Sequence, residues 1–258
     1  MLAAMSPEAE PVFERRDGLL VPTRQARGPW GDTIGGRNLS GLVAYAVELE
    51  HGDDDYQPAR LTVDMFRPVP ATGGLQVKTA MVRRGYRIRV IDASLCDENG
   101  LELLRGTLVQ LRRGQAPSGT VWSPPEWRGP APESLPPFRH PENGLSWDMR
   151  RTEREAWVRE LRPFVGGEML TPFVRAALAA DSANGTANSS EHGLGYINAD
   201  LSMYLTRLPE GEWIGVEATG HGSDRGVAIG TTSLYDSTGR IGHVALCAVA
   251  DSRLLGPP

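Results

Sequence analysis

The amino-acid sequence contains the same plan of elements twice. Leu61–Arg113 and Leu201–Arg253 each begin with an apolar stretch, pass through an acidic turn, and end in a second apolar run. The turn glycines Gly100 and Gly239 occupy matching places in the two copies, so the register is kept over the whole segment. A repeat of this length predicts two similar units fused in one chain.

A segment with helical spacing precedes each copy. Apolar residues recur there at the i, i+3, i+4, i+7 spacing that places side chains on one face of a helix. At the last of these positions the first copy has Ala46, whereas the second has Asp181. A carboxylate on an apolar stripe breaks the pattern and points to a chemical role. The two stripes are Leu39, Leu42, Val43 and Ala46, and Val174, Ala177, Leu178 and Asp181.

One extended run precedes each helix and four follow it. Alternation such as that of Val77, Thr79 and Met81 predicts a sheet with one face against apolar side chains. One apolar helix per copy followed by consecutive strands predicts an α+β fold with an antiparallel sheet, not a parallel βαβ arrangement. The predicted strands are Gly18–Pro22, Ala59–Phe66, Leu75–Arg83, Tyr86–Leu95 and Leu103–Leu111, and then Trp157–Arg162, Asn198–Thr206, Trp213–Gly220, Gly226–Tyr235 and Ile241–Ala250.

The chain is predicted to divide into four segments. Prolines are clustered in residues 114–143, where they remove backbone donors and fix φ, so this stretch is expected to be a linker. Residues 1–17 are polar and are expected to form a loose N-terminal segment. The two folded units are then residues 18–113 and residues 144–258.

Composition excludes several classes of protein. The net charge of −5 argues against a nucleic-acid partner, because phosphate neutralisation requires a basic face. No run reaches the roughly 18 apolar residues of a membrane span, and the start has no signal-peptide pattern, so a cytoplasmic location is expected. Cys96 and Cys247 form no metal-binding pattern, and no metal ligand set or nucleotide-binding glycine motif is present. No metal and no cofactor are therefore expected.

Four arginines surround Gly85 in a predicted hairpin. They could receive the phosphates of a nucleotide-bearing substrate through charge-assisted hydrogen bonds. Alternating strand residues that face solvent explain the same cluster, so both interpretations stay open. The arginines are Arg83, Arg84, Arg87 and Arg89.

The surroundings of Asp181 favour a proton acceptor. Thr171 and Pro172 are typical of a helix start, and Asn184 followed by Gly185 is a plausible helix end, which would place Asp181 in the last turn. An anion there is unfavourable for the helix dipole. Its place on an apolar stripe should raise its pKa and make it a better base near neutral pH. The alternative is a local cap or salt bridge at the helix end.

Gly35 and Gly36 lie immediately before the first helical stripe. Glycines let a ligand approach the backbone closely, and free N–H groups at a helix start are directed at developing negative charge. The pair is thus a candidate oxyanion site, and an ordinary tight loop is the alternative.

The residues around Asp181 also carry a family resemblance. The helix with Asp181, the stretch INADLSMYLTR that contains Asn198, a strand near Trp213 and the last strand IGHVALCAV resemble the double-hotdog acyl-CoA thioesterases, which are related to bacterial acyl-CoA thioesterase II. The resemblance implies two fused hotdog domains, each with a central helix wrapped by an antiparallel sheet. In that family an aspartate, a hydroxyl or amide residue on the next strand and a glutamine on the last strand orient and activate water. Asp181 and Asn198 match the first two, and the glutamine falls on Leu246.

Three functions are compatible with this sequence. The first is hydrolysis of an acyl-CoA thioester to a carboxylic acid and coenzyme A, with Asp181 and Asn198 as catalytic residues and Gly35, Gly36 and Leu246 at substrate-binding positions. The second, motivated by Leu246, is non-catalytic binding of acyl-CoA or lipid. The third is a hotdog hydratase or dehydratase, and it ranks lowest because no histidine follows Asp181 closely. A homo-oligomer remains open, since hotdog sheets commonly pair edge to edge.

Overall fold

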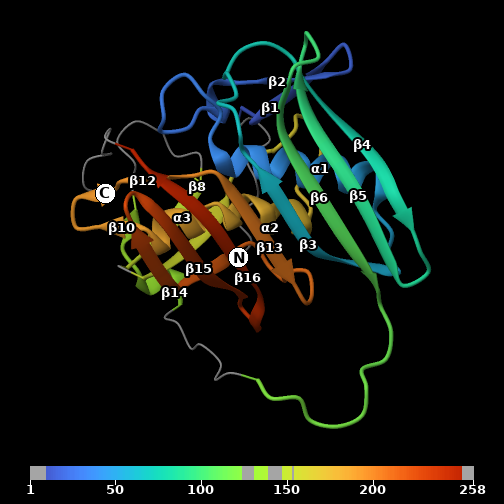
Figure 1. Cartoon of the computed structure of the whole chain (residues 1–258), viewed down its shortest axis with the longest axis vertical. Coiled ribbons are helices and arrows are strands. Elements are labelled where there is room, and N and C mark those ends of the chain that lie inside the picture. Colours follow the sequence, from blue (N-terminus) through green and yellow to red (C-terminus); the bar gives the residue numbers. More distant parts are fainter. Residues whose placement is uncertain (1–9, 124–130, 139–146, 153, 252–258) are drawn as a thin grey trace.

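The structure, a computed structural model, describes residues 10–123, 131–138, 147–152 and 154–251. It is mostly antiparallel sheet with few helices, which confirms the predicted α+β class at that level (Figure 1). The helices are α1 (Gly36–His51), α2 (Pro172–Ala180) and α3 (Ser182–Ala187), with 3-10 turns η1 (Arg24–Ala26) and η2 (Pro132–Ser134). The strands are β1 (Phe13–Arg16), β2 (Leu19–Pro22), β3 (Tyr56–Asp64), β4 (Leu75–Arg84), β5 (Ile88–Asp97), β6 (Glu102–Arg112), β7 (Pro137–Phe138), β8 (Trp147–Arg151), β9 (Glu155–Glu160), β10 (Ser189–Ser190), β11 (Gly193–Leu194), β12 (Tyr196–Asn198), β13 (Asp200–Leu205), β14 (Ile214–Asp224), β15 (Val227–Asp236) and β16 (Gly239–Ala250).

The sequence repeat appears as two strand arrays with the same order. The large sheet runs β1-β2-β4-β5-β6-β3-β13-β16-β15-β14-β9-β8-β7, with β12 paired to β16. Read outward from its middle, β3-β6-β5-β4-β2 on one side matches β13-β16-β15-β14-β9 on the other. The arrays join where β3 and β13 pair antiparallel, with Leu61 opposite Met203.

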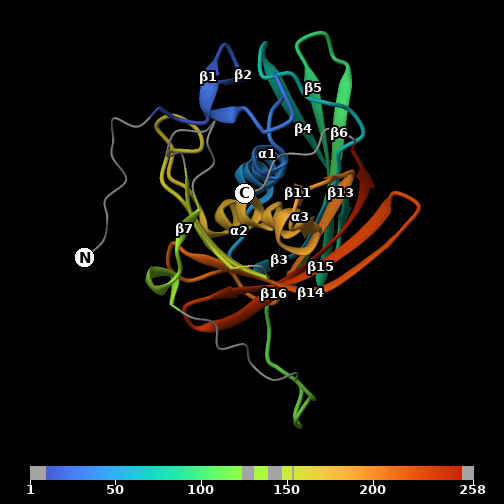
Figure 2. The same cartoon turned by 90° about the vertical axis from the view of Figure 1, so that its left-hand side faces the viewer.

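The two long helices fill the concave side of this sheet. Figure 2 shows α1 and α2 side by side, with the strands curving around them. In the first predicted stripe, Leu42 and Val43 are fully buried. In the second, Ala177 is fully buried and Leu178 is 1% exposed. Each large aliphatic side chain buried in this way contributes about 1.5–3 kcal/mol. None of the described helices is long and apolar enough to cross a membrane.

The N-terminal segment is not loose where the structure describes it. Val12 and Phe13 are fully buried, and the Phe13 N–H donates to the carbonyl of Phe164 over 2.9 Å. Strand β1 then pairs with β2 as a hairpin. The prediction of a loose segment was made from its polar composition, which does not show that two apolar side chains within it pack into the core. Residues 1–9 lie outside the described part of the chain.

The predicted proline-rich linker already contains part of the sheet. Pro137 and Phe138 form β7, which pairs with β8 at the sheet edge, where a proline is tolerated because no partner needs its N–H. Residues 114–123 are largely exposed. Residues 124–130 and 139–143 of the predicted linker are outside the described residues.

The helix that carries Asp181 also differs from the prediction. It was expected to continue to Asn184 and Gly185, but α2 ends at Ala180 and α3 begins at Ser182, with Asp181 at the junction. Asn184 and Gly185 then lie inside α3 and do not end the helix. Asp181 therefore sits at a bend between two helices, as the C-cap of α2 and the N-cap of α3. The unfavourable C-terminal end of the α2 dipole is thus countered by the N-terminus of α3.

Close packing of α1 on α2 depends on Gly41. A Cβ at this buried position would lie 2.7 Å from Leu178 Cδ2 and 2.8 Å from Phe164 Cζ, whereas a Cβ at Gly185 in α3 would meet nothing within 4 Å. Alanine normally stabilises a helix by about 0.5–1 kcal/mol relative to glycine. We expect Gly185→Ala to show this gain and Gly41→Ala to lose about 1–3 kcal/mol through overpacking. Urea unfolding measures both; equal gains would contradict the packing argument.

Candidate active site

A cavity of about 550 Å³ opens between the start of α1, the α2–α3 junction, the end of β3 and β12. Four of the five predicted site residues line it: Gly35, Gly36, Asp181 and Asn198. The wall combines large apolar side chains with arginines and with the small polar residues of α3. The apolar part includes Trp30, Ile34, Leu39, Met65, Phe66, Val69, Met149, Leu194 and Ile197, and the arginines are Arg27, Arg37, Arg67, Arg151 and Arg162.

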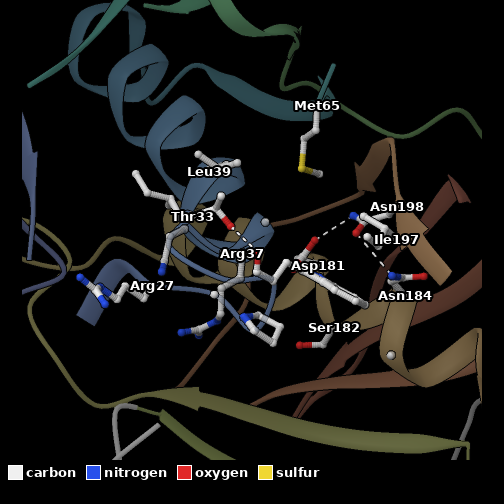
Figure 3. A pocket seen from close by; sticks show the side chains of 18 of the residues that line it. Arg27, Thr33, Arg37, Leu39, Met65, Asp181, Ser182, Asn184, Ile197 and Asn198 are labelled. Carbon is white, nitrogen blue, oxygen red and sulfur yellow. Dashed lines mark hydrogen bonds between the residues drawn. The ribbon is translucent and has the colours of Figure 1, made fainter. Parts of the chain in front are cut away.

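Asp181 lies directly against the N-terminus of α1 (Figure 3). The Asn198 side chain donates from Nδ2 to Asp181 Oδ1 over 2.9 Å, and the backbone N–H of Arg37 also donates to the carboxylate. A Cβ added at Gly36 would lie 2.5 Å from Asp181 Oδ1 and 3.0 Å from Cγ. Glycine at position 36 therefore allows the carboxylate to reach the helix start.

The protein raises the pKa of Asp181. Desolvation by the surrounding core is the largest cause, because burial disfavours the charged form. Asn198 and Arg37 act in the opposite direction by donating hydrogen bonds, and the Arg37 guanidinium adds a favourable charge. The net effect leaves a carboxylate that faces the cavity and is a stronger proton acceptor than an ordinary aspartate.

The two glycines take part in the site differently from the prediction. Gly35 is the N-cap of α1 and Gly36 its first residue, as the sequence suggested. The close approach that they permit is made by the side chain of Asp181, and the N–H of Arg37 is already used by that carboxylate. The positive end of the α1 dipole is thus directed at Asp181 itself.

A buried ion-pair network holds the start of α1 in place. Arg37 Nη1 lies 2.8 Å from Glu160 Oε2, and Arg162 Nε lies 2.9 Å from Glu160 Oε1. The Glu160 side chain is only 1% exposed. Burial alone would raise the pKa of Glu160, but the two guanidinium groups lower it below the ordinary value. This network could not be predicted from local patterns, because Arg37 and Glu160 lie in different repeats.

Asn184 is a second site residue that the sequence did not identify. Its Nδ2 donates to Asn198 Oδ1 over 3.4 Å and to the Tyr196 carbonyl over 3.0 Å. It lines the cavity and is 3% exposed. Asparagine followed by glycine usually indicates the end of a helix. This local pattern concealed the role of Asn184 in the site.

Leu246 does not line the cavity. It belongs to the core, is 3% exposed, and lies opposite Gly230 on β15. Asn198 instead pairs with Ala248, two residues further along β16. Leu246 is therefore not a substrate-binding residue of this cavity, and neither it nor Ala248 offers the amide that the family resemblance predicts.

Other polar residues lie outside the cavity. The arginines around Gly85 are not among the residues that line the cavity, and Arg89 instead pairs with Asp53 over 2.8 Å and stacks on Tyr56. His192 is exposed. Within the described residues, no group of three or more His, Cys, Asp or Glu side chains could hold a metal ion.

Comparisons with known proteins identify the family of this chain. A model of the acyl-CoA thioesterase N-terminal domain matches residues 26–111, and a model of the acyl-CoA thioesterase C-terminal domain matches residues 112–248. The chain belongs to the acyl-CoA thioesterase family, which confirms the resemblance seen in the sequence. No match was found among curated proteins.

Solved structures support the hotdog fold. A protein assigned as a thioesterase from Novosphingobium aromaticivorans is 18% identical, with a TM-score of 0.71 over 95% of this chain and 100% of that one. A hotdog-fold protein of unknown function from Alicyclobacillus acidocaldarius is 14% identical, with a TM-score of 0.69 over 93% and 96% of the two chains. An acyl-CoA thioesterase II from Mycobacterium marinum is 15% identical, with a TM-score of 0.62 over 84% and 90%.

The contact between Gly36 and Asp181 makes a testable prediction. We expect Gly36→Ala to move the Asp181 carboxylate and to lower kcat for thioester hydrolysis by about 100-fold, since a displacement of about 1 Å at a reacting group has an effect of this size. Gly222→Ala is the control, because a Cβ at that strand position meets nothing within 4 Å. Steady-state kinetics with an acyl-CoA and a thiol reagent measures both. Unchanged kcat in Gly36→Ala would show that turnover does not depend on the position of this carboxylate.

Proposed function

We propose that this protein hydrolyses an acyl-CoA thioester, with Asp181 as general base and Asn198 as the residue that positions water. The observation that carries the proposal is the Asp181 carboxylate, which faces the cavity, is hydrogen-bonded to Asn198 and has a raised pKa. Membership of the acyl-CoA thioesterase family supports the reaction class and the substrate class.

The proposed reaction begins with a water molecule beside Asp181. Its oxygen accepts a hydrogen bond from the second N–H of Asn198 Nδ2, the first being used by Asp181. As this oxygen attacks the thioester carbonyl carbon, Asp181 takes the proton from water. The carbon–sulfur bond then breaks, and the coenzyme A thiolate leaves and receives the proton from Asp181. The products are a carboxylic acid and a thiol, and the carboxylate base is restored.

The cavity also supplies electrostatic stabilisation in this proposal. The Gly36 N–H belongs to the first turn of α1, where backbone donors have no partner within the helix. Placed beside Asp181, this turn can stabilise the negative charge that develops on the thioester oxygen. The apolar wall around Met65 and Leu39 provides room for the acyl chain, and the arginines provide positive charge toward an anionic coenzyme.

We also propose that the chain is two fused hotdog units, residues 18–113 and 144–258, each with its helix wrapped by an antiparallel sheet. The matching strand orders and the contacts of α1 with β4 and β5, and of α2 with β9 and β14, support this division. In this arrangement the site combines the helix start of the first unit with the helix bend of the second. Each chain then provides one such site.

Non-catalytic binding of acyl-CoA is the second candidate. It is favoured by one observation, the apolar Leu246 and Ala248 near the strand position where the family resemblance predicts glutamine. Calorimetry combined with a thiol assay separates the two functions. Binding of acyl-CoA without release of free thiol would replace hydrolysis by binding as the function.

Substitution of Asp181 by asparagine separates catalysis from stability. We expect Asp181→Asn to lower kcat by about 100-fold or more, because general-base catalysis is lost. At neutral pH the variant should unfold at a higher urea concentration than wild type, because it removes a charge that is costly to bury. Asp224→Asn is the control for losing one surface charge, since Asp224 is exposed at the end of β14. A variant with full turnover would refute the assigned role.

The raised pKa of Asp181 predicts two pH effects. The acid limb of kcat/KM should lie above pH 4, the range in which an ordinary aspartate titrates, because the base must be deprotonated. For stability, the native state binds this proton more tightly than the unfolded state does. The contribution of Asp181 is thus most favourable below its unfolded pKa and declines as pH rises through the folded pKa. Urea unfolding should show the gain of Asp181→Asn growing from acid to neutral pH; a constant difference would contradict the shift.

A further inference from the structure

A row of side-chain amides begins at Asp181, and Figure 3 shows its first two members, Asn198 and Asn184. Asn198 donates from Nδ2 to Asp181, and its Oδ1 accepts from Asn184 Nδ2 over 3.4 Å. Asn184 Nδ2 also donates to the backbone carbonyl of Tyr196 over 3.0 Å. A carbonyl oxygen and an ionised carboxylate can only accept hydrogen bonds. These two acceptors therefore fix the direction of both amides.

The row continues to a histidine at the surface. With its Nδ2 directed at Tyr196, Asn184 presents Oδ1 to Asn188, which donates from Nδ2 over 2.9 Å. Asn188 then presents its own Oδ1 to His221 Nδ1 at 2.7 Å. Since that oxygen only accepts, His221 carries a proton on Nδ1. In the neutral ring, Nε2 accepts from the Ser223 hydroxyl, 3.1 Å away.

The fold accommodates this row inside its core. Asn184 and Asn188 are 3% and 4% exposed, so their amides depend on one another for hydrogen bonds. Gly230 of β15 leaves space for Asn188, because a Cβ there would lie 3.1 Å from both Asn188 Nδ2 and Oδ1. The fold thus provides both the space and the hydrogen-bond partners that this row of amides needs.

We propose that Asn184, Asn188 and His221 are positioning residues that keep the N–H groups of Asn198 directed toward Asp181 and the cavity. The inference rests on the function proposed for Asp181 and Asn198. A reversed Asn198 amide would place Oδ1 against the carboxylate, acceptor against acceptor, and would present no donor to water. Every donor in the row points toward Asp181, so the aligned dipoles reinforce one another in the low-dielectric core. His221 ends the row at the surface, where its Nδ1–H donates to Asn188 Oδ1 and holds that amide in the same orientation.

Substitution of His221 tests the role with little risk to the fold, because its side chain is exposed. Asparagine and leucine have nearly the same shape, but only asparagine can donate to Asn188 Oδ1 from the position of the imidazole Nδ1. We expect His221→Leu to lower kcat by about 10-fold with KM unchanged, the effect of losing about one hydrogen bond in the transition state, and His221→Asn to retain most of the activity. The control is His243→Leu on the outer face of β16, where His243 stacks on Tyr204.

Nitrogen NMR of the imidazole provides a readout that does not depend on turnover. The neutral form of His221 should show the Nδ1–H tautomer, and Asn188→Leu should abolish that preference. An Nε2–H tautomer in the wild type, or equal kcat in His221→Leu and His221→Asn, would overturn the positioning role. These failures differ from failure of the proposed function, in which wild-type protein releases no thiol from any acyl-CoA while the NMR result still reports the direction of the row.

Discussion

The geometry of the cavity depends on the pairing of β3 with β13. This pairing joins the two strand arrays and brings α1 and α2 together on one concave face, so that the start of α1 meets the bend at Asp181. Its register is set by burial, because Leu61 and Met203 are directly opposite and both are fully buried. A slip by one residue would turn these side chains to the other face of the sheet. The position of a polar carboxylate is thus fixed by an apolar pairing some distance from it.

Local patterns were sufficient for much of the fold. Helices and strands with one buried face have apolar residues at regular intervals in the sequence. These intervals predict the elements without knowledge of any long-range contact. Asp181 was found in the same way, because it interrupts such a period. Asn198 required the family resemblance, since a single asparagine at the end of a short strand has no periodic signal. The structure nevertheless places both residues in one cavity.

The remaining site residues could not be found from local patterns. Arg37 and Glu160 lie in different repeats, and only the packed fold brings them within 2.8 Å of each other. Asn184 precedes a glycine, which is a context typical of a helix end, whereas the hydrogen bonds of Asn184 and Asn188 connect α3 to β12 and β14. The error at Leu246 has a related origin. A strand register inferred from a family resemblance cannot show which residue of β16 pairs with Asn198. In the structure that residue is Ala248.

The mismatch between the repeats also explains why the proposed chemistry is confined to one place. By the repeat, Thr171 corresponds to Gly36 and Ala46 to Asp181, so the start of α2 is the counterpart of the start of α1. There Thr171 caps its own helix and donates to Glu48, whose pKa is raised by burial. The start of α2 therefore has a threonine side chain, whereas the start of α1 has glycines that leave space for Asp181. In the proposed arrangement of two fused units, the two positions can differ in this way, because each can change independently. One position can then hold a buried carboxylate that costs stability, while the other keeps ordinary helix capping.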